Sequence, residues 1–227
     1  HPVGLDARHG ALACVKRLGE LDPPLEHLDA PDPAAWDALV ARAEGAGVFH
    51  TAAWARVWTE EWKDARWEAI ALREGAGGEG GYAGAIGAIV RRRGIFRTVE
   101  AMPFATYGGP IVRRGHPDPA GARRSLLAAF ARWIRGRLVL RSTLAWYEGK
   151  AGEMPERLPF EEGFTHVLPL GRPFDAVAGD FSPSTRRLIR QAEESGLSIR
   201  PIASTEDLRA FYGIAVETVR RRGGTPK

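Results

Sequence analysis

One pair of segments restricts the fold of this 227-residue chain more than any other feature. Residues 67–73 alternate apolar with polar side chains, and residues 82–93 have the length and composition of a second strand. The segment between them, residues 75–81, is rich in glycine. Two strands joined by such a segment pair as an antiparallel hairpin. The chain is therefore expected to contain a sheet in which at least two successive strands are antiparallel.

Capping residues mark the starts of the expected helices. Asp32 precedes Pro33 and Asp118 precedes Pro119, so each aspartate can cap a helix whose first residue is proline. Another helix begins at Thr51. Further strands are expected at residues 25–28, 95–100, 138–147 and 165–170. Helices interspersed with antiparallel hairpins predict an α+β fold, with an α/β-like element order, around one mixed sheet.

The chain is expected to divide into three parts. Residues 1–22 form an N-terminal extension that is either disordered or foreign to the natural protein. Residues 23–172 form a first domain, and residues 173–227 begin a second one. This division follows a connecting stretch at residues 171–180, after which a new helix pattern opens.

The second domain is predicted to contain two helices and one strand. A helix at residues 183–195 ends at Gly196, a strand follows at 197–202, and Ser204 caps a helix at 205–222. So few elements cannot bury a core of their own. We therefore expect this domain to be truncated and the chain alone to have little or no activity.

Charge is distributed unevenly along the chain. The net charge is +4, but residues 1–90 contain eight basic and fourteen acidic residues, whereas residues 91–227 contain 24 and 14. The basic residues are mostly arginines, which bind phosphate and carboxylate through two-point contacts. A basic second half suits an anionic partner such as a nucleotide, a phosphorylated precursor or RNA. A general bias toward arginine in the source genome explains the same composition.

The sequence lacks the motifs of covalent and metal-dependent catalysis. It has one cysteine, and its six histidines show no metal-ligand spacing, so no metal site is predicted. Gly-x-Ser-x-Gly, His-Glu-x-x-His and Walker motifs do not occur. Catalytic residues stay unassigned, and group transfer driven by binding and positioning is favoured. No apolar run is long enough for a membrane span, so we expect a cytoplasmic protein.

An arginine-rich helix is the first candidate binding site. Arg186 and Arg187 fall in its first turn, where the helix dipole disfavours cations, and Arg190 shares a side with Arg186. A bound anion would relieve this conflict. The alternative is a solvated helix face whose charge is offset by Glu193 and Glu194.

Aromatic residues supply two further candidates. Trp54, Trp58 and Trp62 recur every four residues and share one helix face, which suits core packing or a binding platform. Tyr107 precedes two glycines and a proline. This segment can approach a ligand closely with the tyrosine ring alongside it, or form a structural turn with a packed tyrosine.

Four segments carry a resemblance to a known family. They are Phe-His-Thr-Ala-Ala-Trp at 49–54, Thr-Tyr-Gly-Gly-Pro-Ile-Val at 106–112, Thr-His-Val-Leu-Pro-Leu at 165–170, and the basic segment 184–197. In this order they resemble the Fem-type family of GNAT-fold transferases. That family includes aminoacyl-tRNA-dependent builders of peptidoglycan cross-bridges and CelD-like acetyltransferases. The resemblance covers roughly residues 25–222.

The resemblance implies two tandem GNAT-like domains, each a mixed, largely antiparallel sheet flanked by helices, that share a cleft. The donor would be acyl-CoA or aminoacyl-tRNA. The acceptor would be an amine or hydroxyl of a peptidoglycan or polysaccharide precursor of the cell envelope. Substrate contacts of the family carry over to Trp54 and Tyr107, and contacts to anionic groups to Arg186, Arg187 and Arg190.

Some residues depart from the family pattern. Arg113 and Arg114 follow the Gly-Pro turn, where cross-bridge enzymes often have an acidic residue, and no inserted coiled-coil arm is visible. Residues 91–96 do not complete the usual acyl-CoA loop, so we expect any donor site in the second domain. Two alternatives stay open: a nucleic-acid-binding module, and a non-catalytic GNAT-like module that serves in assembly.

Overall fold

The computed structural model describes residues 4–6, 25–75, 81–104, 106–147, 149–155, 160–165, 167–169 and 171–225. The chain divides into two units, unit 1 (His1–Gly163) and unit 2 (Phe164–Lys227), and each is described by itself. The domain division expected from the sequence at residues 172–173 stays a prediction. None of the helices in the described ranges has the length and apolar character that a membrane crossing needs.

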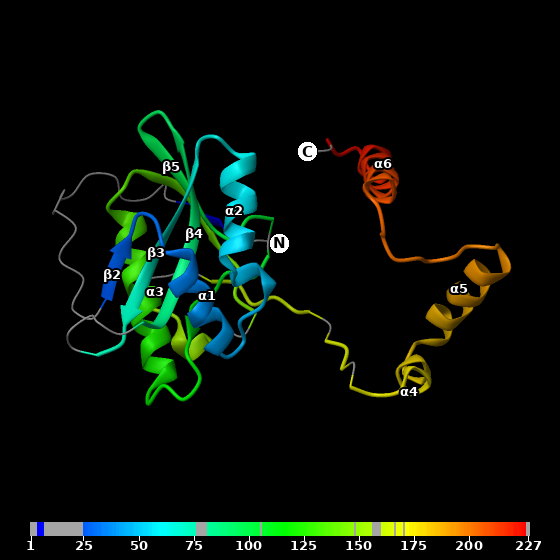
Figure 1. Cartoon of the computed structure of the whole chain (residues 1–227), viewed down its shortest axis with the longest axis horizontal. Helices are drawn as coiled ribbons and strands as arrows, with labels where there is room; N and C mark the ends of the chain where they lie inside the picture. The colour runs from blue at the N-terminus through cyan, green and yellow to red at the C-terminus, as the bar shows by residue number, and fades with distance from the viewer. Residues whose placement is uncertain are drawn as a thin grey trace. The chain divides into compact units, whose positions relative to one another are not determined.

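Unit 1 is built around a seven-stranded sheet (Figure 1). The strands are β1 (Gly4–Asp6), β2 (Leu25–Leu28), β3 (Ala65–Arg73), β4 (Tyr82–Arg93), β5 (Phe96–Ala101), β6 (Ile111–Val112) and β7 (Val139–Leu144). Their order is β1-β7-β5-β4-β3-β2, and β6 pairs with β4. Only the β5–β7 pair is parallel among the pairs described. The predicted α+β class with a mixed, largely antiparallel sheet is therefore confirmed.

β3 and β4 form the antiparallel pair that the sequence predicts. Its register pairs Trp67 with Ile89 and Ile70 with Ile86. Gly87 in β4 is explained by packing on its face, because a Cβ there would lie 3.0 Å from the Trp36 ring and 3.1 Å from the Trp67 ring nitrogen. The glycine thus makes room for two tryptophans above the sheet.

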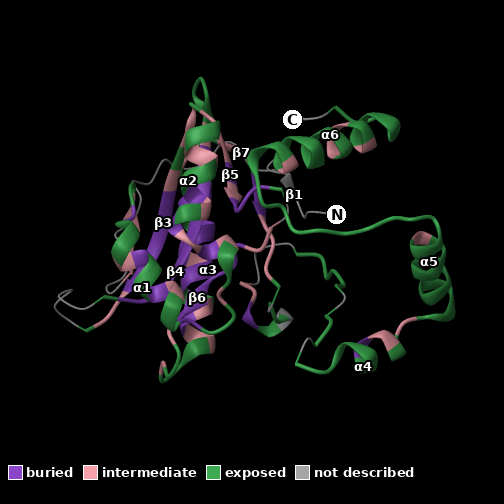
Figure 2. Cartoon of the chain, turned by 45° about the vertical axis from the view of Figure 1, so that its right-hand side comes forward, coloured by how far each residue is buried: buried purple, intermediate pink, exposed green. Residues whose placement is uncertain are grey.

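Helices cover both faces of the sheet. α1 (Pro33–Arg42) and α2 (Ala52–Glu61) pack on one face, and α3 (Pro119–Arg135) packs on the other. Alternate residues of β3 separate the two cores, since Ala69 packs with α1 residues and Ile70 packs with α3 residues. Figure 2 shows that burial in unit 1 is concentrated in the central strands and in the helix faces above them.

The predicted helix starts of unit 1 are confirmed by their caps. Asp32 Oδ1 accepts from the Ala35 N–H at 2.7 Å, and Asp118 Oδ1 accepts from the Gly121 N–H at 2.8 Å. Thr51 Oγ1 accepts from the N–H of the third residue of its helix at 3.2 Å. These side chains satisfy N–H groups that have no partner inside the helix.

Unit 2 contains the helices α4 (Phe174–Gly179), α5 (Pro183–Glu194) and α6 (Thr205–Arg221). The described parts of segments 165–170 and 197–202 are not strands, so both strand predictions are wrong there. Apolar character alone does not make a strand, because its backbone N–H and C=O groups need a paired neighbour. α5 and α6 bury no residues. Their predicted starts are confirmed by the caps Ser182 and Ser204.

Candidate functional site

The parallel strands β5 and β7 end side by side, and this is where the candidate site lies. Ala101 is opposite Leu144 in the register. The segments that follow are joined directly, since the Gly108 N–H donates to the Ala145 carbonyl oxygen at 2.9 Å. In sheets with parallel strands, ligands commonly bind at the carboxyl ends of neighbouring strands. The topology therefore brings the segment around Tyr107 to a favourable place for binding.

Two glycines after β5 allow the chain to pack against itself. A Cβ on Gly108 would lie 1.8 Å from the Ala101 carbonyl oxygen, and one on Gly109 would lie 2.1 Å from the Trp146 ring. Both distances are far below van der Waals contact. The sequence left open whether this segment approaches a ligand or forms a structural turn, and these contacts support the structural role for the glycines themselves.

The backbone between β5 and Tyr107 is strained. Met102 and Phe104 have positive φ angles of 78° and 60°, which residues with a side chain adopt rarely. The Met102 N–H donates to the Glu100 carbonyl oxygen at 2.8 Å, and Thr106 Oγ1 donates to the Pro103 carbonyl oxygen at 2.9 Å. Strain of this kind is concentrated at ligand-binding and catalytic sites in many proteins. It supports a functional role for the segment after β5.

Seven aromatic side chains form a continuous series on unit 1, which we call the aromatic row. It comprises Tyr147, Tyr107, Phe49, Trp54, Trp58, Phe104 and Trp62. The Phe49 ring centroid lies 5.2 Å from that of Trp54 and 6.4 Å from that of Tyr107. The other neighbouring centroids are 5.0 to 6.3 Å apart. The structure thus brings Trp54 and Tyr107 together through Phe49.

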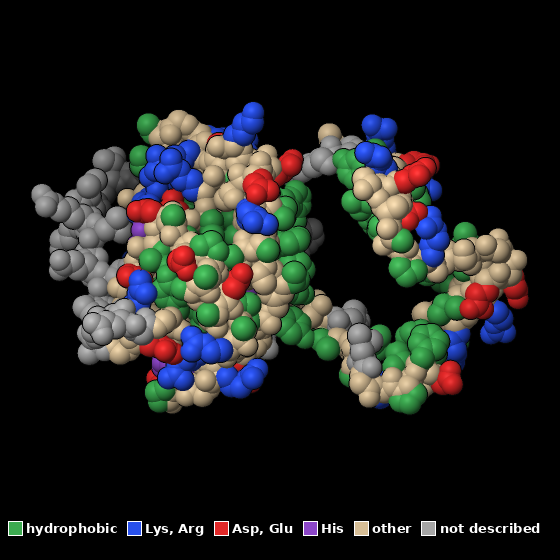
Figure 3. Space-filling view, in the orientation of Figure 1, with side chains coloured by type: hydrophobic (Ala, Val, Ile, Leu, Met, Phe, Trp, Pro, Cys, Tyr) green, Lys and Arg blue, Asp and Glu red, His purple; other side chains and the backbone are tan. Residues whose placement is uncertain are grey.

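The sequence allowed the three tryptophans of the row either to pack in the core or to form a binding platform, and their burial is intermediate. Trp54, Trp58 and Trp62 are half-buried and belong to neither hydrophobic cluster of unit 1. The indole nitrogens of Trp54 and Trp58 are buried without a hydrogen-bond partner in the described part of the chain. Figure 3 shows hydrophobic side chains gathered along the side of unit 1 next to α2. A partly exposed row of rings suits a binding platform better than a core.

Polar contacts between α1 and the start of α2 hold segment 49–54 in place. Trp36 Nε1 donates to the His50 carbonyl oxygen at 2.6 Å, and the Ala52 N–H donates to Asp37 Oδ1 at 2.8 Å. Burial lowers the pKa of His50, so its ring is neutral near pH 7. These two hydrogen bonds tie the segment that carries Phe49 and Trp54 to α1.

Glu100 in β5 is an acidic residue on the sheet face that α1 and α2 cover. It is opposite Ile89 in the register, so it shares a sheet face with Trp67 and with α1 and α2. Its side chain is half-buried, and among the described residues its carboxylate makes no hydrogen bond or ion pair. Sequence reasoning missed Glu100, because only the register shows which side of β5 it occupies.

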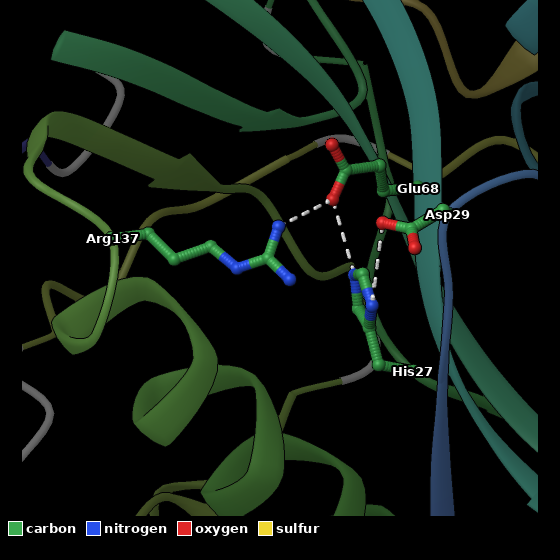
Figure 4. Close-up of polar contacts among 4 residues, drawn as sticks. All are labelled: His27, Asp29, Glu68 and Arg137. Atoms are coloured by element: carbon green, nitrogen blue, oxygen red, sulfur yellow. Dashed lines mark hydrogen bonds and ion pairs between the residues drawn. The ribbon is translucent and has the colours of Figure 1, made fainter. Parts of the chain in front are cut away.

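A separate polar cluster lies on the opposite face of the sheet, near the end of α3 (Figure 4). Glu68 in β3 is buried, and its Oε2 lies 3.1 Å from both His27 Nε2 and Arg137 Nη1. His27 Nδ1 lies 3.6 Å from Asp29 Oδ1. Burial acts to raise the pKa of Glu68, but the hydrogen bond from His27 and the charges of Arg137 and Arg97 outweigh it and lower the pKa.

This cluster has the ligand types of a metal site but the charges of an ion network. His27, Asp29 and Glu68 each place one potential ligand atom within 4.8 Å of the others. The Glu68 oxygen nearest to them already accepts from Arg137, whose positive charge repels a cation. We therefore assign the cluster to the stability of unit 1.

No family model, no curated protein and no solved structure matches this chain.

The predicted arginines lie in unit 2. Arg186, Arg187 and Arg190 are exposed on α5, and Arg186 Nη1 donates to the Gly179 carbonyl oxygen at 2.9 Å. Glu193 and Glu194, on the same helix, are exposed as well. The structure thus brings together Trp54 and Tyr107 of the predicted site in unit 1, and the three arginines are exposed on α5 of unit 2.

Proposed function

We propose that this chain belongs to a Fem-type, GNAT-like acyltransferase. It transfers an acyl or aminoacyl group from acyl-CoA or aminoacyl-tRNA to an amine or hydroxyl of a cell-envelope precursor. One observation carries the proposal: segments 49–54 and 106–112, both part of the family resemblance, meet at the aromatic row through Phe49. The mixed, largely antiparallel sheet flanked by helices supports the same family.

The proposed roles follow from the chemistry of each side chain. Trp54 and Tyr107 offer ring faces that hold the acceptor next to the carboxyl ends of β5 and β7. The acceptor nitrogen or oxygen attacks the donor carbonyl, and the CoA thiolate or the tRNA hydroxyl leaves. Orienting the two reactants supplies much of the rate. Arg186, Arg187 and Arg190 bind the phosphates of the donor.

Residues 91–96, which do not complete the usual acyl-CoA loop in sequence, form part of a β-hairpin. Residues 91–96 form the end of β4, a turn and the start of β5, and the turn contains Gly94 with a φ of +62°. A tight hairpin turn does not present a row of N–H groups at a helix N-terminus, as pyrophosphate binding requires. This supports a donor site in unit 2 rather than at this loop.

Binding experiments test the proposal without requiring turnover. All seven tryptophans lie in unit 1, so quenching of their fluorescence reports binding at that unit. The acceptor probe is a peptidoglycan-precursor pentapeptide with a free lysine amine. We expect Trp54→Ala to weaken its binding about tenfold, the loss of one aromatic contact of about 1.4 kcal/mol. Val57→Ala, an exposed position on the same helix, is the matched control and should leave binding unchanged.

The donor is tested by its effect on thermal unfolding. Acetyl-CoA and an aminoacyl-tRNA are each compared with the deacylated molecule, since a ligand that binds only the native state raises the unfolding temperature. Replacing the three arginines of α5 by alanine should abolish the shift, whereas replacing Arg209, Arg220 and Arg221 of α6 should preserve it. The proposal is wrong if neither donor class changes the unfolding temperature and the acceptor probe does not quench fluorescence.

A nucleic-acid-binding module is the second candidate, favoured by the exposed arginines of α5. Within the described residues, Arg187 and Arg190 form no ion pair, so both guanidinium groups are available to bind phosphates. Such binding is sequence-independent and falls steeply with salt. Tight binding of deacylated RNA, equal to that of aminoacyl-tRNA, would favour this candidate over acyl transfer.

A further inference from the structure

We propose that unit 1 docks on an anionic lipid surface through the tip of the β4–β5 hairpin and the adjoining start of β7. Exposed apolar side chains enter the lipid interface there, and flanking arginines bind the lipid phosphates. This surface uses no residue of the aromatic row, and it needs no donor, no acceptor and no residue of unit 2. It therefore goes beyond acyl transfer and concerns where the protein is held.

The turn of the hairpin exposes an apolar residue that folding does not require. Arg93 is opposite Phe96, so Gly94 and Ile95 form a two-residue loop. Gly94 supplies the positive φ, +62°, that such loops need at their first position. Ile95 occupies the second position and is 71% exposed. A polar residue would serve the turn as well, so the exposed isoleucine points to contact with an apolar medium.

The start of β7 adds exposed apolar residues beside the hairpin. The Arg97 N–H donates to the Leu138 carbonyl oxygen at 3.2 Å, which places the chain after α3 next to the start of β5. Leu138 is 60% exposed at a φ of +49°, a conformation that glycine adopts at lower cost. Leu140, also exposed, is the extra residue where the β5–β7 register shifts between Val139 and Arg141. We call the four exposed apolar residues of this end of unit 1 the tip patch: Ile95, Phe96, Leu138 and Leu140.

Arginines flank the tip patch. Arg92 and Arg93 precede the turn, both are exposed, and neither forms an ion pair within the described ranges. Arg92 is opposite Arg97 in the register, so the two share a face of the sheet. Burial lowers the pKa of Arg97, and the charges of Arg92 and Arg137 lower it further, so the three guanidinium groups are close enough to repel one another. Figure 3 shows Lys and Arg side chains gathered close to this end of the hairpin.

The neighbouring carboxylates do not neutralise this positive charge, because they already have partners. Asp64 Oδ1 lies 3.2 Å from Arg91 Nε, and Glu68 Oε2 lies 3.1 Å from Arg137 Nη1. Arg92 therefore adds net positive charge next to the apolar side chains, and so does the adjacent arginine of the turn. Anionic lipid headgroups complement this charge.

A lipid surface fits both the apolar and the basic parts of the tip. A second copy of this chain would bring two groups of arginines together, which repel each other. RNA would bind Arg92 and Arg93 but would leave Ile95 and Leu138 in water. At a bilayer, the apolar side chains enter the boundary between headgroups and acyl chains, while the arginine heads stay at the phosphates.

Co-sedimentation of the whole chain with lipid vesicles tests the docking. The vesicles contain either phosphatidylcholine alone or equal parts of phosphatidylcholine and phosphatidylglycerol. We expect the anionic vesicles to bind about tenfold more tightly than the neutral ones at low ionic strength, and added salt to weaken this preference. Equal binding to both kinds of vesicle would overturn the proposal, and so would the absence of binding to either.

An apolar substitution at the turn locates the contact. Ile95→Ser should weaken binding to the anionic vesicles about tenfold, because it removes an apolar side chain that enters the interface. Val48→Ser, at an exposed position of unit 1 outside the tip patch, is the matched control and should leave binding unchanged.

A pair of charge substitutions tests the arginines. Replacing both Arg92 and Arg93 by glutamine should weaken binding to the anionic vesicles about tenfold or more. Replacing Arg56 and Arg124, both exposed elsewhere on unit 1, removes the same net charge and should have little effect. Equal losses in the two pairs would overturn the proposal. RNA binding that depends on Arg92 and Arg93, together with vesicle binding that Ile95→Ser leaves unchanged, would also overturn it in favour of a nucleic-acid contact, and the wild-type comparison of vesicles stands even if a variant fails to fold.

Discussion

Replacing Glu68 by glutamine tests the ion network between β2, β3 and the end of α3. The carboxylate is buried, with 3% of its side chain exposed, and it faces His27 and Arg137. Arg97 is close enough to affect its pKa, and Arg97 Nη1 is buried without a hydrogen-bond partner. Glutamine keeps the volume and one acceptor oxygen but removes the negative charge.

The expected loss of stability arises because the Glu68→Gln variant leaves the positive charge of Arg137 without its partner. Removing one partner of a buried ion pair costs about 3–5 kcal/mol, because the other charge stays desolvated. Here 18% of the Arg137 side chain is exposed, so water compensates part of the loss. The amide oxygen of glutamine also preserves one hydrogen bond. We therefore expect Glu68→Gln to lower the free energy of unfolding by about 2–3 kcal/mol near neutral pH.

Urea unfolding followed by tryptophan fluorescence measures this loss. All seven tryptophans lie in unit 1, and the Trp133 ring lies 5.3 Å from the His27 ring, so the signal reports the affected unit. Glu26→Gln is the matched control. Glu26 pairs with Arg73 on the same two strands, but both side chains are about a third exposed, so we expect a loss of at most about 1 kcal/mol.

The pH dependence gives the reasoning a second test. The pKa of Glu68 in the folded chain is below its ordinary value of 4.5, so its stabilising effect is complete above that value. The effect is lost as the pH falls through the lower, folded pKa. The difference between wild type and Glu68→Gln should therefore shrink as the pH is lowered below 4.5. A loss below about 0.5 kcal/mol near pH 7, or a difference that does not change in acid, would refute the assignment.

Two further predictions concern the segment after β5 and the basic helix. Gly109→Ala places a Cβ about 2 Å from the Trp146 ring, so we expect a loss of about 3 kcal/mol in urea unfolding, beyond ordinary overpacking. Gly47→Ala, where a Cβ meets no atom within 4 Å, should change stability by less than about 1 kcal/mol, and equal losses would contradict the reasoning. Replacing Arg186, Arg187 and Arg190 by alanine should flatten the salt dependence of RNA binding by about two units on a double logarithmic scale. An unchanged slope would show that these arginines do not contact phosphates.

The helix starts and the β3–β4 hairpin were predictable from the sequence, because interactions between neighbouring residues determine them. Each cap at Asp32, Thr51, Asp118 and Ser204 lies next to the N–H groups that it satisfies, so a few neighbouring residues determine where the helix starts. The central hairpin was predictable for the same reason, since its strands are close in the sequence.

Features that depend on residues far apart in the sequence, such as strand pairing, could not be predicted in this way. The segment at residues 197–202 has a strand-like composition but no strand to pair with in the described part of the chain. β6 was missed, because two residues carry no alternation and its pairing with β4 requires the fold. Glu100 illustrates the limit for the candidate site. Only its pairing opposite Ile89 shows that it lies on the sheet face covered by α1 and α2.

The short strand β1 has a consequence for how copies of this protein behave toward one another. It pairs with β7 through Gly4, Leu5 and Asp6, opposite Thr143, Ser142 and Arg141. β7 is otherwise the last strand on that side of the described sheet, and an uncovered strand offers its N–H and C=O groups to any chain that can add to it. β1 therefore covers part of the edge of β7 and replaces it with an edge only three residues long, which is a poorer template for strand addition. Substitutions that break the β1–β7 pairing are expected to expose the edge of β7 to other chains.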